Sequence, residues 1–412
     1  MHIDLDFVRS QFPVFDSATN SDAFFENAGG SYACRQTIDA LTTYYTHTKV
    51  QPYAEYAASA AAGATMDLSR RRWAAALGVD ASEVQFGPST SMNTYVLANA
   101  FRAVLSPGDE VIVTNQDHEA NTGAIRRAAE AAGATLLEWR TDPANGLLDI
   151  SGLANLLTDN TRLVTFPHCS NIVGQENDVK AVTAMIHEAG ARAIVDGVSY
   201  APHGFPDLSD LDPDVYLFSL YKTYSVHQGL MVVRRGLIDD LPNQGHFFND
   251  ELANKRLTPA GPDHAQEAAA GAVLDYVEAF ARHHDIEGAT LRATAAAVLD
   301  LWQAAENRLS GPVLSWLDAH PRVRLIGPPE PVGRLHRAPT IAFSPTDRTP
   351  QEVATDLVAS GIQISAGHYY GYRVLEGVGL DPNRGVVRAS FVHYTSPSDT
   401  EALIDALDSA LR

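Results

Sequence analysis

Two strand-like runs end near residues that could hold an aldehyde cofactor. The run Val215–Ser219 leads within a few residues into Lys222, and an earlier run, Ala193–Val195, is followed by Asp196. In a parallel sheet, ligands bind at the carboxyl ends of the strands. Pyridoxal phosphate (PLP) needs an amine for its Schiff base and an acid beside its pyridine nitrogen. The pattern therefore favours a PLP site, in which Ser219 could reach the phosphate.

Each of these residues also has an ordinary structural explanation. A lysine after a strand is usually a solvated strand end. An aspartate in that place is common in any parallel α/β protein, because polar residues gather at this edge of the sheet. The PLP interpretation therefore depends on whether the rest of the chain supplies the other groups that such a site needs.

Phosphate-binding residues are predicted where a strand meets a helix, at Gly87–Ser91. The hydroxyl groups of Ser89, Thr90 and Ser91 and the free N–H groups of a helix N-terminus bind phosphate well. An ordinary N-cap explains the same residues. The chain has no Gly-x-Gly-x-x-Gly motif and no Walker lysine, which argues against a dinucleotide fold and a nucleoside triphosphatase.

Polar residues after other strands extend the same edge. His118 follows the strand Glu110–Thr114 and could stack on a flat heteroaromatic ring, although a surface or helix-capping histidine fits as well. Asn171 ends another strand and could donate a hydrogen bond to a phenolate oxygen. Two glycines in the turn Asn27–Gly30 let the backbone approach a ligand closely, but a plain turn is the simpler explanation for that segment alone.

Arg388 lies in a late strand, Val387–Phe391, whose other residues are apolar or small. A buried arginine must be paired. A bidentate clamp on a substrate carboxylate is one explanation, and a salt bridge within the protein is the other. No metal site is predicted, because His283, His284 and Asp285 occupy adjacent positions, which do not share one face of a helix.

Strand and helix patterns alternate over residues 83–233, which predicts βαβ units and a mostly parallel sheet covered on both faces. Prolines and glycines predict a loop at 236–265, followed by a helix at Gln266–Ala281 and a long helix at Ile286–Arg308. We expect an α/β protein with an N-terminal segment (1–25) packing with the small domain, a large domain (26–285) and a small C-terminal α+β domain (286–412).

The composition excludes several classes of partner. The 412 residues include 50 acidic and 30 basic side chains, for a formal charge of −20. A nucleic-acid binder needs a basic surface, and so does docking on anionic lipid. The two cysteines, Cys34 and Cys169, form no Cys-x-x-Cys motif. The N-terminus lacks a signal-peptide pattern and no apolar run is long enough to span a bilayer, so we expect a cytoplasmic enzyme with no membrane partner.

In this order, the motifs resemble the class V aminotransferase family of fold-type-I PLP enzymes, which includes cysteine desulfurases and selenocysteine lyases. The matching segments are Phe25–Gly30, Gly87–Asn93, Pro107–Val113, Asp117–Asn121, Ser170–Gly174, Val195–His203, Phe218–Lys222 and Val387–Tyr394. The resemblance implies that Lys222 forms the Schiff base, that His118 stacks on the ring, and that Asn27, Gly29 and Arg388 bind the substrate carboxylate. It implies further cofactor contacts from Ser89, Thr90, Ser91, Asn171, Asp196, Ser199, Ser219 and Tyr221, and a homodimer as the usual assembly.

The chain departs from the desulfurases of this family at several positions. Ser199 replaces their usual glutamine, Tyr221 replaces the histidine before the lysine, and Tyr370 falls where the persulfide-forming cysteine is expected. Gly261-Pro262-Asp263 stands in place of Gly-Thr-Pro, which puts in doubt a phosphate contact from the partner subunit. The sequence therefore most resembles the desulfurase-like subgroup that lacks the catalytic cysteine.

We expect a PLP-dependent lyase that acts on an amino acid or an amino-acid conjugate, most simply by β-elimination at a carbon–sulfur bond without a persulfide. Lys222 would remove the α-proton, and Tyr370 could pass a proton or shape the pocket. The alternatives are a class V aminotransferase, epimerase or decarboxylative oxidase acting on an amino-acid-derived metabolite, and a non-catalytic homologue that binds a partner protein.

Overall fold

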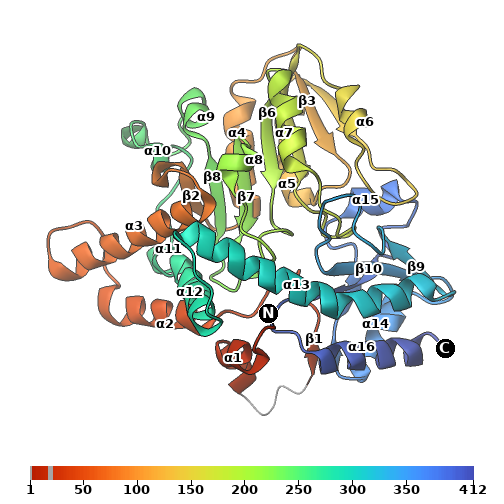
Figure 1. The fold of residues 1–412 in the computed structure, drawn as a ribbon. Helices are drawn as coiled ribbons and strands as arrows, with labels where there is room; N and C mark the ends of the chain where they lie inside the picture. The colour runs from red at the N-terminus through yellow and green to blue at the C-terminus, as the bar shows by residue number, and fades with distance from the viewer. Residues whose placement is uncertain (1, 17–21) are drawn as a thin grey trace.

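A seven-stranded sheet forms the centre of the large domain in the computed structural model, which describes residues 2–16 and 22–412 (Figure 1). Residues 17–21 of the predicted N-terminal segment, and Met1, lie outside the described residues. In sheet order the strands are β2 (Val84–Gly87), β8 (Gly229–Val233), β7 (Val215–Ser219), β6 (Arg192–Asp196), β5 (Thr161–Pro167), β3 (Glu110–Thr114) and β4 (Thr135–Trp139). Strand β8 is antiparallel to both neighbours, and the other pairings are parallel, which confirms the predicted α/β class with a mostly parallel sheet.

Helices cover both faces of this sheet, because its strands are apolar on both sides. In β6, Ala193 and Val195 join one buried cluster while Ile194 joins the other, as the two-residue period of a strand requires. One face is covered by α4 (Thr90–Arg102), α5 (Glu119–Ala132), α9 (Arg235–Asp240) and α10 (Ala253–Arg256). The other face is covered by α3 (Ala57–Leu77), α6 (Ile150–Ala154), α7 (Val179–Glu188), α8 (Leu208–Leu211) and α12 (Val273–His283).

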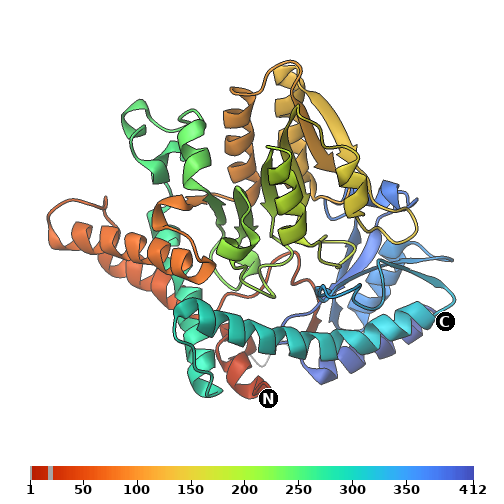
Figure 2. The same cartoon turned by 45° about the horizontal axis from the view of Figure 1, so that its top comes forward.

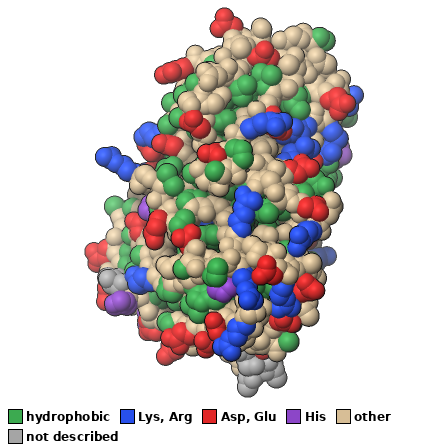
Figure 3. Space-filling view, turned by 90° about the vertical axis from the view of Figure 1, so that its right-hand side faces the viewer, with side chains coloured by type: hydrophobic (Ala, Val, Ile, Leu, Met, Phe, Trp, Pro, Cys, Tyr) green, Lys and Arg blue, Asp and Glu red, His purple; other side chains and the backbone are tan. Residues whose placement is uncertain are grey.

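The small domain is built on an antiparallel sheet with the order β12-β13-β10-β9. Its elements are β9 (Val323–Ile326), β10 (Thr340–Pro345), α14 (Pro350–Ala359), β12 (Ser365–Gly367), α15 (Tyr372–Gly377), β13 (Val386–Ser390) and α16 (Pro397–Ala410). The N-terminal segment contributes α1 (Leu5–Ser10) and β1 (Ala23–Phe24), and β1 pairs in parallel with β11 (Ile362–Gln363). On the right-hand side of the molecule, basic and acidic side chains are interspersed (Figure 3).

One long helix, α13 (Leu291–Ala319), runs from the large domain to the small one (Figures 1 and 2). The predicted bounds, Ile286–Arg308, were wrong at both ends. The helix begins after Thr290, whose hydroxyl accepts a hydrogen bond from the Ala293 amide. It continues through Pro312, which removes one backbone donor from the helix.

Two other predicted elements also differ. The loop expected at 236–265 contains the short helices α9 and α10, which form between its prolines and glycines. The helix expected at Gln266–Ala281 is divided into α11 (His264–Ala269), a 3-10 turn and α12, because Gly271 in the turn packs directly on the backbone of α3. Helix α2 (Arg35–Thr43) packs beside α11. Within the described residues, no helix is both long and apolar enough to cross a bilayer.

Gly229, at the start of β8, should contribute to the stability of the sheet where the strand meets the Ser89–Thr90 backbone. A Cβ there would lie 2.4 Å from the backbone of Ser89 and Thr90. We expect Gly229→Ala to lower the free energy of unfolding by about 1–3 kcal/mol, the usual cost of overpacking. Gly236→Ala in α9 meets open space and should raise it by up to about 1 kcal/mol. Denaturant titration of both variants tests this, and equal effects would contradict it.

Candidate active site

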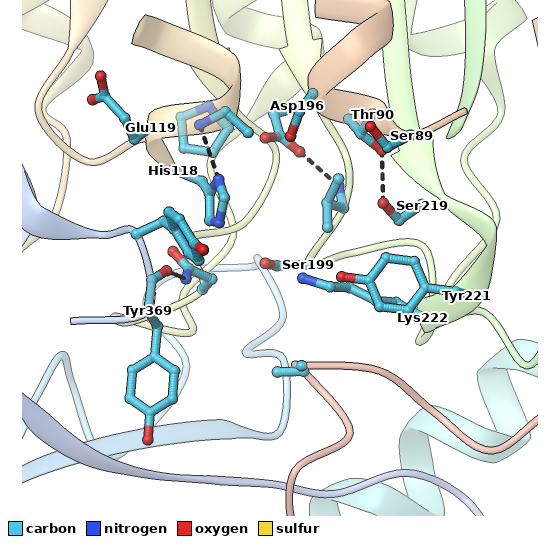
Figure 4. Close-up of a pocket in the computed structure, with 18 of the residues that line it drawn as sticks. Ser89, Thr90, His118, Glu119, Asp196, Ser199, Ser219, Tyr221, Lys222 and Tyr369 are labelled. Carbon is cyan, nitrogen blue, oxygen red and sulfur yellow. Dashed lines mark hydrogen bonds between the residues drawn. The ribbon is translucent and has the colours of Figure 1, made fainter. Parts of the chain in front are cut away.

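A cavity of about 780 Å³ opens at the carboxyl ends of the parallel strands, within the usual size range for small-molecule sites (Figure 4). Both domains contribute to it. Its lining includes these residues singled out from the sequence: Gly29, Ser89, Thr90, Ser91, His118, Asn171, Asp196, Ser199, Ser219, Tyr221, Lys222, Tyr370 and Arg388. The structure therefore brings together side chains that are separated by hundreds of residues in the chain.

Asn27 lies outside this lining, unlike its neighbour Gly29. Its amide nitrogen donates to the Ser390 carbonyl at 2.7 Å, and its amide oxygen accepts a hydrogen bond from the Tyr394 hydroxyl. The side chain is thus used to fasten the N-terminal turn to the small domain. Of the predicted turn Asn27–Gly30, Ala28 and Gly29 line the cavity that contains Arg388.

Lys222 is delivered to the cavity by strand β7 and one 3-10 turn, Leu220–Lys222, at the end of that strand. Its side chain is 9% exposed. Burial, aided by the positive charge of Arg388, lowers the pKa of Lys222 to about 8, while Asp196 acts in the opposite direction. Much more of this amine is unprotonated near neutral pH than for an exposed lysine, which is the form that attacks a carbonyl carbon.

Asp196 ends strand β6 on the same edge and is 4% exposed. Its carboxylate accepts a hydrogen bond of 2.8 Å from the Val198 amide. Burial nevertheless raises the pKa of Asp196 to about 6, although the Val198 hydrogen bond and Lys222 both favour the ionised form. A cation placed against this carboxylate would stabilise its charge, as a protonated ring nitrogen does.

His118 performs the capping role that was considered for it and also faces the cavity. Its Nδ1 accepts a hydrogen bond of 3.0 Å from the Ala120 amide at the start of α5. Burial, with the nearby positive charges of Lys222 and Arg388, lowers the pKa of His118 to about 3. The ring is therefore neutral at physiological pH, and its centroid lies 5.1 Å from that of the exposed Tyr370.

Hydroxyl groups gather where β7 ends and α4 begins (Figure 4). The Thr90 and Ser219 hydroxyls are 2.7 Å apart, and the Ser89 hydroxyl caps α4 by accepting from the Met92 amide. The backbone of this loop rests directly against Gly229. The arrangement resembles other helix N-termini that receive an anion, and the ordinary N-cap at Ser89 is present as well.

Arg388 approaches the cavity from strand β13 and is 3% exposed. Its guanidinium group lies 3.9 Å from the centroid of the Tyr369 ring, and Nη1 donates to the Asn171 carbonyl at 3.4 Å. Nε has no partner, and no carboxylate in the described chain lies within salt-bridge distance. Burial lowers the pKa of Arg388 below its ordinary value. The internal salt bridge that could have explained the burial of Arg388 is therefore absent from the described residues.

The segment after β12 closes one side of the cavity and is held at several points. The Tyr369 carbonyl accepts from the Asn171 amide group and the Tyr370 carbonyl from the Glu119 amide, each at 2.9 Å. Arg373 pairs with the Glu119 carboxylate at 3.4 Å. Tyr369 and Tyr370 both have positive φ, 48° and 58°, a conformation that is rare outside glycine.

Sequence reasoning missed several residues of the lining, notably Glu26, His227, Ser365 and Tyr369. Glu26 was visible in the N-terminal turn, and Tyr369 stands beside Tyr370. His227 could have been suspected as the one imidazole between Lys222 and the next strand. The described residues contain no cluster of three or more side chains suited to a metal ion.

The cavity fits PLP on its own geometry. It presents a buried amine, a buried carboxyl group and a hydroxyl-lined helix N-terminus, and the Asn171 amide oxygen in its lining has no partner among the described residues. Of the four lysines in the chain, Lys222 is buried, and Lys49, Lys180 and Lys255 are exposed. Lys222 is thus the lysine placed to hold the cofactor.

Comparison with known proteins agrees with this geometry. The family model described as "Aminotransferase class-V" matches residues 23–403. An aminotransferase-like protein of Gibberella zeae is 33% identical over 98% of both chains, and a cysteine desulfurase of Serratia proteamaculans is 27% identical over 99% of this chain and 98% of its own.

Solved structures show the same fold. The cysteine desulfurase CsdA of Escherichia coli aligns with a TM-score of 0.84 at 23% identity, over 100% of this chain and 99% of its own. A C-DES mutant with glycine covalently linked to its PLP cofactor aligns with a TM-score of 0.76 at 17% identity, over 97% of this chain and 98% of its own. The chain belongs to the class V aminotransferase family, and it is a PLP-dependent, cysteine desulfurase-like enzyme of fold type I.

Proposed function

We propose that this enzyme is a lyase that eliminates a β-substituent from an amino acid or amino-acid conjugate without storing sulfur on a cysteine. The observation that carries the proposal is the combination of groups in the cavity. Lys222, Asp196 and an unpaired Arg388 suit the handling of an amino acid, and the cavity lining includes Tyr370, the residue that the sequence resemblance aligns with the expected thiol. A leaving group that departs unaided, such as a sulfinate or thiolate, needs no nucleophilic sulfur.

Neither cysteine is a ready nucleophile, because the thiolate is the reactive form. Cys34 is buried in the core of the large domain, outside the cavity lining, and burial raises its pKa to about 11. Cys169 does line the cavity, but it is 2% exposed and its thiol donates to the Gly174 carbonyl at 3.2 Å. Burial raises the pKa of Cys169 as well.

In this proposal, each of the cavity residues has a separate role. PLP, when bound, supplies an electron sink that makes the Cα–H bond of an attached amino acid acidic. Arg388 binds the α-carboxylate, and Lys222 takes the proton from Cα. Asp196 holds a proton on the pyridine nitrogen, and the neutral His118 ring covers one face of the site and excludes water.

The leaving group needs a proton source when it departs as a strong base. Tyr370 lies at the cavity wall beside His118, and it is 64% exposed. Its hydroxyl group is therefore positioned to exchange protons with solvent. This assigns Tyr370 a role in proton transfer or in shaping the pocket, as a tyrosine cannot store sulfur.

Amino-group transfer is the second candidate, because the relative in Gibberella zeae carries the name aminotransferase-like. The two reactions differ in their products. Incubation of the PLP-loaded enzyme with an amino acid and a keto-acid acceptor would yield a new amino acid in the case of transfer. Elimination yields ammonia, a keto acid and the free substituent without an acceptor.

The intact set of Lys222, Asp196 and Arg388 argues against a non-catalytic partner-binding role.

We also propose that the enzyme acts as a homodimer. Several large apolar side chains near α2, α3 and the segment before α10 are exposed in the single chain: Tyr45, Tyr53, Tyr56, Phe247 and Phe248. Phe247 is 87% exposed, which is unusual for an isolated soluble surface. A second copy of the chain is the occupant that the fold family favours.

Lys222 should be the site of cofactor attachment. Borohydride reduction of the PLP-loaded protein, followed by peptide mapping, should place a pyridoxyl group on the peptide that contains Lys222. We expect Lys222→Ala to fold and to show no stable adduct, whereas Lys180→Ala, at an exposed lysine, should label like the unmodified chain. A principal adduct on Lys49, Lys180 or Lys255 would refute the assignment.

Arg388→Lys should weaken amino-acid binding while PLP stays bound. A lost bidentate charged contact costs about 1.5–3 kcal/mol, which is about 10- to 150-fold in affinity. Spectral titration of the PLP-loaded protein with a panel of amino acids gives the measurement. Arg384→Lys, at an exposed arginine of the same domain, is the control. Unchanged amino-acid affinity in Arg388→Lys would make Arg388 structural.

The enzyme should not depend on either cysteine. We expect Cys34→Ser/Cys169→Ser to retain the full turnover rate on whichever amino acid the panel identifies, with Cys34→Ala/Cys169→Ala as a second variant in case the buried serines destabilise the fold. The wild type should carry no protein-bound sulfane sulfur after incubation with L-cysteine. Loss of turnover together with bound sulfane sulfur would instead indicate a desulfurase with a relocated thiol.

A further inference from the structure

The phosphate end of the cavity is built mostly from neutral groups. Ser89, Thr90, Ser91 and Ser219 offer hydroxyls, and α4 offers its N-terminus. A phosphate ester carries about −1.5 to −2 charges at neutral pH, so neutral donors leave much of that charge uncompensated. Arg388 belongs to the opposite side, with Asn171 and Tyr369. Arg127 lies at the rim, exposed and bound to the Tyr95 hydroxyl.

His227 is the additional basic side chain that the fold brings to this end. It lines the same cavity and stacks on Tyr221, with ring centroids 4.8 Å apart and planes inclined by 27°. Two residues later, Gly229 packs against the backbone of Ser89 and Thr90. The loop that carries His227 is therefore fixed against the backbone that forms the hydroxyl-lined end.

The imidazole ring of His227 is exposed, and it makes no hydrogen bond or ion pair with the described residues. Its ring contact leaves the nitrogen atoms at the ring edge available to a ligand. Tyr221, in turn, packs against Gly30, where a Cβ would lie 3.1 Å from its ring. Tyr221 thus forms a flat support between the N-terminal turn and His227.

We propose that His227 binds the cofactor phosphate as an imidazolium ion, and that Tyr221 positions it by stacking. This inference rests on the proposed phosphate position at Ser89–Ser91. A dianion next to an imidazole favours the protonated ring, and charge-assisted hydrogen bonds to phosphate are strong.

The proposal predicts a pH dependence of phosphate recognition. An imidazolium ion loses its charge as the pH rises, and its charge-assisted contact with a phosphate is lost with it. The phosphate itself gains its second charge near pH 6, so the benefit should be greatest about neutrality and should fall at higher pH. Tyr221 contacts the His227 ring directly. The other titratable groups in the lining of the same cavity are Glu26, Tyr95, His118, Glu119, Arg127, Cys169, Asp196, Lys222, Tyr369, Tyr370 and Arg388.

Comparison of PLP with pyridoxal separates these contributions. Pyridoxal lacks the phosphate but has the same aldehyde and ring, so titration of Lys222 and Asp196 affects both compounds alike. The ratio of their dissociation constants, measured on the cofactor-free full chain from pH 5.5 to 9, therefore reports the phosphate contacts alone. Inorganic phosphate as a competitor against PLP gives a second reading of the same contacts.

We expect the preference for PLP over pyridoxal at pH 7 to fall by roughly 10-fold in His227→Phe, which keeps the stacking and loses the charge. Pyridoxal affinity should be unchanged. In His227→Phe the preference should no longer decline between pH 7 and 9. His227→Lys should restore the preference and hold it to higher pH, and His320→Phe, at a histidine outside the cavity, should match the wild type.

Three outcomes would overturn the proposal. An unchanged preference in His227→Phe would show that the phosphate does not contact His227. An equal loss of PLP and pyridoxal affinity would show a structural role for the loop. If the wild type itself showed no preference for PLP, the phosphate position would be wrong. Failure of the lyase assignment alone would leave all of these binding ratios unaffected.

Discussion

The cavity depends on buried ionisable side chains to which the described part of the chain supplies no ion-pair partner. Lys222, Asp196 and Arg388 are all nearly inaccessible to water, yet none forms an ion pair with another within the described chain. Burial shifts the pKa of each toward the neutral form, because the charged form loses its hydration. A protonated pyridine nitrogen would supply the counter-charge of Asp196, and a substrate carboxylate would supply that of Arg388. The arrangement is thus more consistent with PLP and an amino acid than with a structural salt-bridge network.

The fold maintains this imbalance by fixing each charge on a different rigid element. Asp196 and Lys222 follow neighbouring strands of one sheet, so their spacing is set by backbone hydrogen bonds. Arg388 lies in the middle of another sheet, in the small domain. The two sheets are held relative to one another by α13 and by the N-terminal segment, which pairs through β1 with β11. This framework keeps Lys222, Asp196 and Arg388 from moving together to form ion pairs.

Sequence patterns were sufficient for the sheet and for the residues at its edge. Apolar runs identified the strands β3, β6 and β7 within a residue or two, because buried parallel strands have a distinct composition. The residues at strand ends, such as Asp196 and Asn171, could be placed in one cavity for the same reason. Arg388 was recognisable because a charge inside an apolar strand has few explanations.

Other features depended on long-range packing and could not be predicted. Beyond Pro312, α13 buries Val313, Leu314 and Leu317 in the core of the small domain. The helix is divided at Gly271, which packs closely against Ser69 of α3. The Asn27 side chain was assigned to ligand binding, but its hydrogen bonds to Ser390 and Tyr394 appear only when the C-terminal strand is in place. Cavity residues in loops, such as His227 and Tyr369, carry no periodic pattern that indicates which way they point.

The attachment of the segment around Tyr370 has a consequence for what can leave the active site. Hydrogen bonds from Asn171 and Glu119 to its backbone carbonyls, and the ion pair of Arg373 with Glu119, hold this segment of the small domain against the large domain. An arm that delivers covalently bound cargo to an acceptor protein must swing outward, and a segment tied at these points is ill suited to such motion. Under the proposed elimination, products would depart as free small molecules past the residues beside Tyr370, which these contacts hold in place.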